Sequence, residues 1–142
     1  MGNIDKKVLN DIYNTSKIGL DSVEFLYRKV KDEDLKEDLN EYVRKYYDIL
    51  NETRYRLELL NEKPKDYTPV SKAMMWTGLQ ANTLLNDSSS KIAEILIQGS
   101  TKGIVEMTKS VNNDIISEDI RKIANTLIHY EKENINNIKK HI

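Results

Sequence analysis

Residues 9–30 read LNDIYNTSKIGLDSVEFLYRKV. Small and apolar side chains recur in this stretch in alternating steps of three and four residues: Leu9, Ile12, Ser16, Gly19, Val23, Leu26 and Val30. This spacing places them along one face of an α-helix. The stretch therefore predicts a long amphipathic helix over about residues 5–31. The polar turn that follows contains Asp32 and Asp34, either of which would cap the next helix.

The same spacing predicts a second helix from about Leu35 to Asn61. The connection after it, residues 61–69, contains both prolines of the chain. A proline disfavours helical backbone at the residue before it, so the second helix must end there. Thr68 followed by Pro69 is in turn typical of a helix start, with threonine as the cap and proline in the first turn.

Helical pattern then continues from Pro69 to Lys109, which would make one helix of roughly 60 Å. The first two helices would each measure roughly 40 Å, so an unbroken third helix would extend far beyond them. The run 86–90, NDSSS, supplies a break because Asn, Asp and Ser side chains compete for backbone hydrogen bonds. We therefore expect a short helix at 71–85 and a long one at 90–109.

The last helix is predicted from Ser117 to the C-terminus, with Glu118 and Asp119 in its first turn, where acidic groups complement the helix dipole. No alternating run of β-branched residues predicts a strand. The sequence thus predicts an all-α chain: an antiparallel four-helix bundle with an extra short helix before the third long helix. Residues 1–142 are expected to form one domain.

Composition excludes several classes of function. Lys and Arg number 22 against 23 Asp and Glu, and the two signs are interspersed, so no nucleic-acid or membrane partner is expected. The chain has no cysteine, which excludes disulfides, a thiolate nucleophile and cysteine-ligated metal sites. No apolar leader segment is present at the N-terminus, and we expect a cytoplasmic protein.

Several short stretches carry a resemblance to a known superfamily. They are LNDI at 9–12, VKDEDLK at 30–36, LLNEKP at 59–64, Trp76 in the short helix, ND at 86–87 and QGS at 98–100. Their order and spacing over nearly the whole chain resemble bacterial ferritin-like four-helix domains of unknown function, relatives of the rubrerythrin and bacterioferritin bundles. The resemblance implies a ferritin-like bundle.

Some members of that superfamily bind a di-iron or di-manganese pair. Such sites take a carboxylate from each of two helices and a Glu-x-x-His pair from each of the other two. The two histidines of this chain are His129 and His141, but positions three residues before them are Thr126 and Ile138. No cofactor is therefore expected, and iron or manganese would be bound only if a degenerate form of the site persists.

Glu131 is the candidate residue for such a remnant. It occupies a core-facing position of the last helix, between Ile128 and Ile135. An unpaired carboxylate there would cost several kcal/mol or shift its pKa upward. One interpretation makes Glu131 a metal ligand or proton carrier. The other pairs it by hydrogen bonds with a core hydroxyl, for which Tyr46, Ser16 and Thr53 are available. No catalytic or cofactor-binding residue is assigned.

Small residues lie near the middle of two helices: Ser16 and Gly19 on the first, and Ser100 and Gly103 on the third long helix. They would either let two helices approach closely or leave a cavity for a ligand. On the outer face of the first helix, Ile18 and Phe25 lie seven residues apart. They predict a surface for a second copy of the chain, unless the loop with Tyr67 or the short helix with Trp76 covers them.

Three functions are compatible with these features, of which we expect the first and keep the other two as alternatives. The first is a non-catalytic bundle that acts through self-association or protein binding, using the first helix around Ile18 and Phe25. The second is a degenerate di-metal carboxylate protein that uses Glu131. The third is a small-molecule-binding bundle that uses the space beside Gly19 and Gly103.

Overall fold

The computed structural model describes residues 3–113 and 115–142, and within them the chain is all-helical. Five α-helices follow one another: α1 (Asn3–Tyr27), α2 (Glu33–Leu59), α3 (Pro69–Leu84), α4 (Ser89–Val111) and α5 (Glu118–Ile138). A short 3₁₀ helix, η1 (Lys139–His141), follows α5. The predicted all-α class is confirmed, and so is the extra short helix before the third long one.

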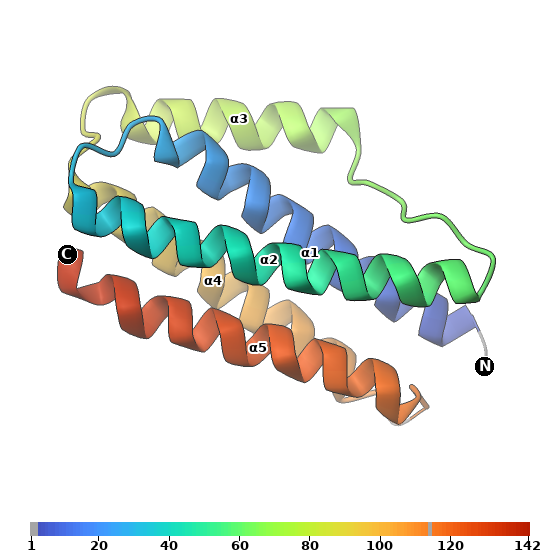
Figure 1. Ribbon diagram of the computed structural model, residues 1–142. Coiled ribbons are helices and arrows are strands. Elements are labelled where there is room, and N and C mark those ends of the chain that lie inside the picture. The colour runs from blue at the N-terminus through green and yellow to red at the C-terminus, as the bar shows by residue number, and fades with distance from the viewer. Residues whose placement is uncertain (1–2, 114) are drawn as a thin grey trace.

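The four long helices, α1, α2, α4 and α5, lie side by side, and α3 lies on the outside of this group (Figure 1). The tightest pairings are α1 with α2 and α4 with α5, whereas α3 packs against α1. An extended segment, residues 61–68, leads from the end of α2 to the start of α3. This segment lets α3 cross to the far side of α1.

The core-facing pattern of α1 is confirmed. Leu9, Ile12, Val23 and Leu26 are buried, and Ser16 is buried with them. The core continues between the four long helices through Leu35, Leu39, Leu57, Ile92, Met107, Leu127 and Ile138. In α5, Asn134 takes a buried place that the spacing had given to Ile135, which is half-buried. The prediction that α5 continues to the C-terminus was wrong, because α5 ends at Ile138 and Ile142 is exposed.

Side-chain caps define most of the helix starts. Asp32 accepts a hydrogen bond from the Asp34 backbone N–H (3.0 Å), and Thr68 accepts one from the Ser71 N–H (3.1 Å). Ser88 lies within the predicted break at 86–90, and its side chain accepts a hydrogen bond from the Lys91 N–H (3.2 Å) at the start of α4. Ser117 makes no side-chain cap bond; instead its backbone N–H donates to Asp5 Oδ1 at 2.9 Å.

The helix caps at Ser88 and Ser117 predict different effects of mutation on stability. We expect Ser88→Ala to lower the free energy of unfolding by about 1 kcal/mol, because the Lys91 N–H loses its acceptor. Ser117→Ala removes no such bond and should cost clearly less. Urea denaturation followed by circular dichroism measures both, and equal losses would contradict the assigned role of Ser88.

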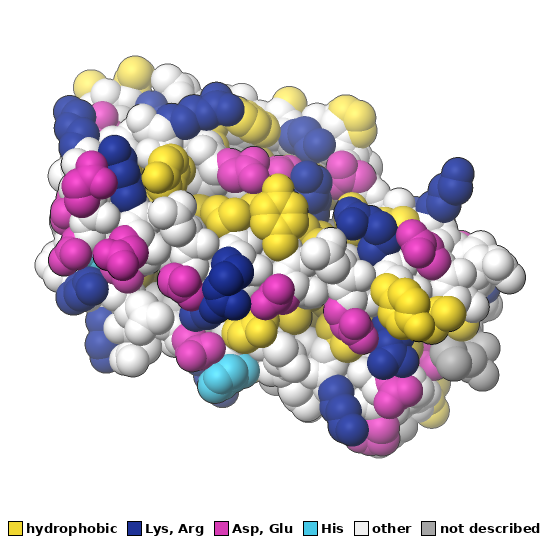
Figure 2. Space-filling view, in the orientation of Figure 1, with side chains coloured by type: hydrophobic (Ala, Val, Ile, Leu, Met, Phe, Trp, Pro, Cys, Tyr) yellow, Lys and Arg dark blue, Asp and Glu magenta, His cyan; other side chains and the backbone are white. Residues whose placement is uncertain are grey.

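The surface carries charge of both signs. Figure 2 shows Lys and Arg side chains interspersed with Asp and Glu on the face formed by α2 and α5. In the described part of the chain, no helix is both long enough and apolar enough to cross a membrane.

Candidate functional site

A buried carboxylate lies at the centre of the bundle. Glu131 of α5 is 2% exposed, so the prediction that it faces the core is confirmed. Its Oε1 accepts three hydrogen bonds: from the Tyr46 hydroxyl of α2 at 2.8 Å, from Ser100 Oγ of α4 at 3.1 Å and from Asn134 Nδ2 of α5 at 3.3 Å. Side chains from three helices thus fix the orientation of this carboxyl group.

The partners of Glu131 were only partly predicted. Tyr46 is confirmed as a partner. Ser16 and Thr53 are not, because Ser16 Oγ has no hydrogen-bond partner among the described residues and Thr53 Oγ1 donates to the Ile49 carbonyl within α2. Asn134 was missed, although its place three residues after Glu131 puts both side chains on one face of α5.

The second oxygen, Oε2, faces the other way. No hydrogen-bond donor of the described residues reaches it, whereas Oε1 has three. It lies beside Gly103 of α4, where a Cβ atom would come within 2.6 Å of it. Gly19 of α1 leaves space for the Tyr46 ring in the same way, because a Cβ at Gly19 would lie 2.5 Å from the ring carbon Cζ. The two glycines therefore make the room that Tyr46 and Glu131 occupy.

A cavity of about 230 Å³ adjoins this carboxyl group. It lies between α1 and α4, with Leu79 of α3 among its walls. The lining is largely apolar, from residues that include Ile18, Gly19, Val23, Leu79, Leu96 and Gly103. Its charged members are Glu131, Lys102 and Glu106. Both earlier interpretations of the small residues apply here, since they allow close packing on Tyr46 and also border a cavity.

Burial sets the protonation of the site. It raises the pKa of Glu131 from 4.5 to about 7, although the three hydrogen bonds to Oε1 and the nearby Lys45 oppose the shift. The pKa of Tyr46 lies well above 10 because the ring is buried and its hydroxyl faces the carboxylate, so Tyr46 stays a donor. Burial likewise raises the pKa of Tyr42, whose hydroxyl lies 3.5 Å from Ser100 Oγ.

A buried lysine completes the polar cluster on the side away from the cavity. Lys45 is 5% exposed, and its Nζ lies 3.4 Å from Asn134 Oδ1 and 3.8 Å from Glu133 Oε1. Its positive charge acts on Glu131 from a distance and opposes the rise in the pKa of that carboxyl group. Among the described residues, no Lys or Arg forms an ion pair with Glu131.

The donors around Glu131 do not fit a di-metal centre. Within residues 3–113 and 115–142, no three His, Cys, Asp or Glu side chains come together where they could hold a metal ion. His129 lies on the surface, with its Nε2 3.4 Å from Glu133 Oε1, one helical turn away. His141 lies at the C-terminal end, with Nε2 2.7 Å from Asp38 Oδ2. The site offers a fixed carboxyl group and an adjoining cavity.

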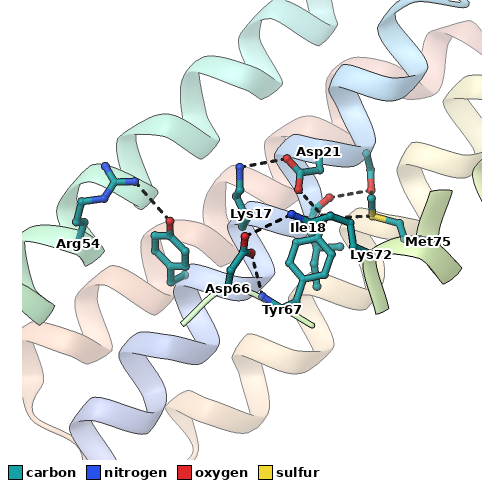
Figure 3. A network of polar contacts seen from close by, with 10 residues as sticks. Lys17, Ile18, Asp21, Arg54, Asp66, Tyr67, Lys72 and Met75 are labelled. Atoms are coloured by element: carbon teal, nitrogen blue, oxygen red, sulfur yellow. Dashed lines mark hydrogen bonds and ion pairs between the residues drawn. The ribbon is translucent and has the colours of Figure 1, made fainter. Parts of the chain in front are cut away.

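The outer face of α1 is held to α3 by a polar network (Figure 3). The Tyr67 hydroxyl donates to Asp21 Oδ2 at 2.5 Å, and Lys17 Nζ lies 3.3 Å from Asp21 Oδ1. Ser22 Oγ lies 3.3 Å from Met75 Sδ of α3. The segment before α3 and its first turns are thereby fixed against α1.

The predicted self-association surface lies under this network. Phe25 packs edge-on against Trp76, with ring centroids 4.8 Å apart, and Ile18 borders the cavity with 39% of its surface exposed. The cover expected as the alternative, the Tyr67 loop and the Trp76 helix, is therefore present on this face. Self-association through Ile18 and Phe25 stays a prediction.

Comparison with known proteins supports the fold alone. No protein-family model matches the sequence, and no curated protein is similar to it. Among solved structures, the chain is similar to YcfI from Rhodopseudomonas palustris, described as "a putative structural protein". The two share 14% sequence identity with a TM-score of 0.75, over 93% of this chain and 88% of that one. At this identity the likeness concerns the arrangement of helices.

Proposed function

We propose that the protein is a non-catalytic binding protein that holds a small, largely apolar molecule in the cavity between α1 and α4. The observation that carries the proposal is the pairing of this cavity with Oε2 of the buried residue Glu131, an oxygen that no donor of the described residues reaches. Small-molecule sites are typically apolar cavities with a few fixed polar groups that orient the ligand.

The size of the cavity suits a compact organic molecule. An apolar cavity of about 150 Å³ in another protein stays dry and binds benzene. The cavity here is about 230 Å³, which leaves room for two fused rings and a short polar substituent. Apolar walls favour the ring system through the hydrophobic effect, and Glu131 supplies the polar end.

We infer further that the fold is an antiparallel four-helix bundle of the ferritin-like kind. The short turns after α1 and α4 favour antiparallel neighbours. The longer connection through α3 would then cross the bundle between α2 and α4. In this arrangement the cavity lies between α1 and α4 beside the bundle core, with Glu131 as its buried carboxyl group.

Binding of 1-naphthylmethanol, a neutral two-ring alcohol, tests the proposed function. We expect saturable binding at one site by isothermal titration calorimetry, and a rise in melting temperature, because a ligand that binds only the folded state stabilises it. Gly99 borders the cavity and has open space around its Cβ position, so Gly99→Trp should fill the cavity and weaken binding roughly tenfold or more.

Gly78→Trp is the matched control. Gly78 also has open space at its Cβ position, but it lies on α3 and does not border the cavity. It should leave the affinity unchanged. The proposed site would be rejected if the alcohol gave no saturable binding, or if Gly99→Trp and Gly78→Trp bound it equally well.

A further inference from the structure

The cavity offers acceptors to a ligand and has few free donors. The hydroxyls of Tyr46 and Ser100 both donate to Glu131 Oε1. Ser22 Oγ lies 2.8 Å from the Ile18 carbonyl and close to Met75 Sδ. Thr15 turns its methyl carbon Cγ2 toward Gly103. A ligand that enters this cavity therefore meets an unpaired carboxyl oxygen at its inner end.

The charges that line the cavity are unbalanced. The lining holds one basic side chain, Lys102, and two acidic ones, Glu106 and Glu131, so an ionised Glu131 leaves one negative charge in excess. Lys102 and Glu106 are both exposed, and Glu106 lies 3.9 Å from Lys109 Nζ. Of the elements packed around Glu131, α2 contributes Tyr42, Tyr46 and Lys45, and α4 contributes Ser100, whereas α1 presents Gly19. The one cation in this set, Lys45, is directed at Asn134 and Glu133.

We propose, on the basis of the binding function above, that the ligand is an apolar molecule with one protonated amine, whose ammonium group pairs with Glu131 Oε2. An ammonium group supplies the missing positive charge and up to three N–H donors to a side of the site that has only an acceptor. The apolar remainder lies along Val23, Leu79 and Leu96.

The three donors on Oε1 favour this ligand over others. They stabilise the ionised form of Glu131, and they hold Oε2 in one direction, toward the cavity. A ligand carboxylate placed at the buried Glu131 would face a like charge, which is unfavourable in an apolar site, and the basic side chain of the lining, Lys102, lies exposed on α4 and not beside Glu131 Oε1. A neutral alcohol would donate one hydrogen bond but bring no charge. We therefore expect the affinity to be highest for the amine, lower for the alcohol and lowest for the acid.

Three probes that share one ring system test this ranking. They are 1-naphthylmethylamine, 1-naphthylmethanol and 1-naphthoic acid, titrated into the full chain by calorimetry at pH 8. We expect the amine to bind at least about tenfold more tightly than the alcohol, since a charge-assisted hydrogen bond is roughly twice as strong as a neutral one. The acid should bind most weakly.

The variant Glu131→Gln tests whether the charge of Glu131 causes the preference for the amine. The glutamine side chain keeps an acceptor for Tyr46, Ser100 and Asn134 but carries no charge, so the amine and the alcohol should bind this variant with equal affinity. Circular dichroism and thermal unfolding establish that the variant is folded. In the wild type, the affinity for the amine should also fall as the pH is lowered from 8 to 5.5, because Glu131, with a pKa of about 7, takes up a proton. The affinity for the alcohol should change little.

The outcomes separate the two proposals. If the alcohol binds and responds to Gly99→Trp, but the amine binds no better, the cavity site stands and the amine class is overturned. The same holds if the preference for the amine persists in Glu131→Gln, or if the acid binds best. If none of the three probes binds, the binding function itself fails.

Discussion

We expect Glu131→Gln to be more stable than the wild type at pH 8, by about 3 kcal/mol in the free energy of unfolding. The folded protein holds the pKa of Glu131 at about 7, above its ordinary value of 4.5. Each unit of such a shift corresponds to about 1.4 kcal/mol, and the ionised form bears this penalty in the folded state. Glutamine has nearly the same shape and keeps the acceptor that Tyr46, Ser100 and Asn134 use, but it cannot ionise.

The direction of the pH dependence follows from the same shift. Between pH 4.5 and about 7 the folded protein binds more protons at Glu131 than the unfolded chain does, so its stability falls as the pH rises through that window. Above about pH 7 the penalty is complete and constant. The stability difference between Glu131→Gln and the wild type should therefore grow from about pH 5 to pH 7 and then level off.

Urea denaturation at half-unit steps from pH 5 to pH 8 measures this difference. Glu24→Gln is a suitable control, because it makes the same chemical change at an exposed position of α1. The difference in the free energy of unfolding between Glu131→Gln and the wild type could instead stay constant from pH 5 to pH 8. That result would show that Glu131 titrates alike in the folded and unfolded protein. Some other interaction would then have to offset the free-energy cost of burying the ionised Glu131.

The helices and the inward position of Glu131 could be predicted from the sequence because both depend on local spacing. Ile128 and Ile138 lie on the buried face of the last helix, and a glutamate at 131 shares it by helical spacing. Thr68 and Pro69 likewise marked a helix start through their own backbone preferences. In each case the relevant information lies within one or two turns of the residue concerned.

The site itself depends on contacts between helices, which local spacing does not determine. Ser100 and Tyr46 donate to the same oxygen of Glu131 only because α2, α4 and α5 have a particular relative register. Gly19 and Gly103 suggested either close packing or a cavity, and both are present because each glycine faces a side chain from a different neighbouring helix. The packing of Trp76 on Phe25 also depends on where the long 61–68 segment places α3.

Gly19→Ala should be among the most damaging single-methyl additions in the chain. The new Cβ would lie 2.5 Å from Cζ and 2.7 Å from the hydroxyl oxygen of Tyr46, whose ring is buried. Overpacking of this kind costs about 1–3 kcal/mol. Any shift of the ring also weakens the Tyr46–Glu131 hydrogen bond. Alanine is favoured over glycine in a helix by about 1 kcal/mol, which offsets only part of the loss. We expect a net destabilisation of about 2 kcal/mol.

Gly99→Ala is the matched control, since Gly99 also lies inside a helix but has nothing within 4 Å of its Cβ position. It should stabilise the protein by up to about 1 kcal/mol through helix propensity alone. Gly103→Ala should fall between the two, because the atom it meets is Glu131 Oε2, the end of a flexible side chain, and not a rigid ring.

A double-mutant cycle, measured by urea denaturation, tests whether contact with the Tyr46 ring causes the loss of stability in Gly19→Ala. In a Tyr46→Leu background the ring is absent, so adding Gly19→Ala should cost nothing or stabilise the protein slightly. If Gly19→Ala were as harmless as Gly99→Ala in the wild type, α1 and α2 would have to separate easily at this level. The tight placement of Tyr46, on which the fixed orientation of Glu131 depends, would then be lost. The same experiment therefore tests whether Gly19 holds the donor side of the candidate site in place.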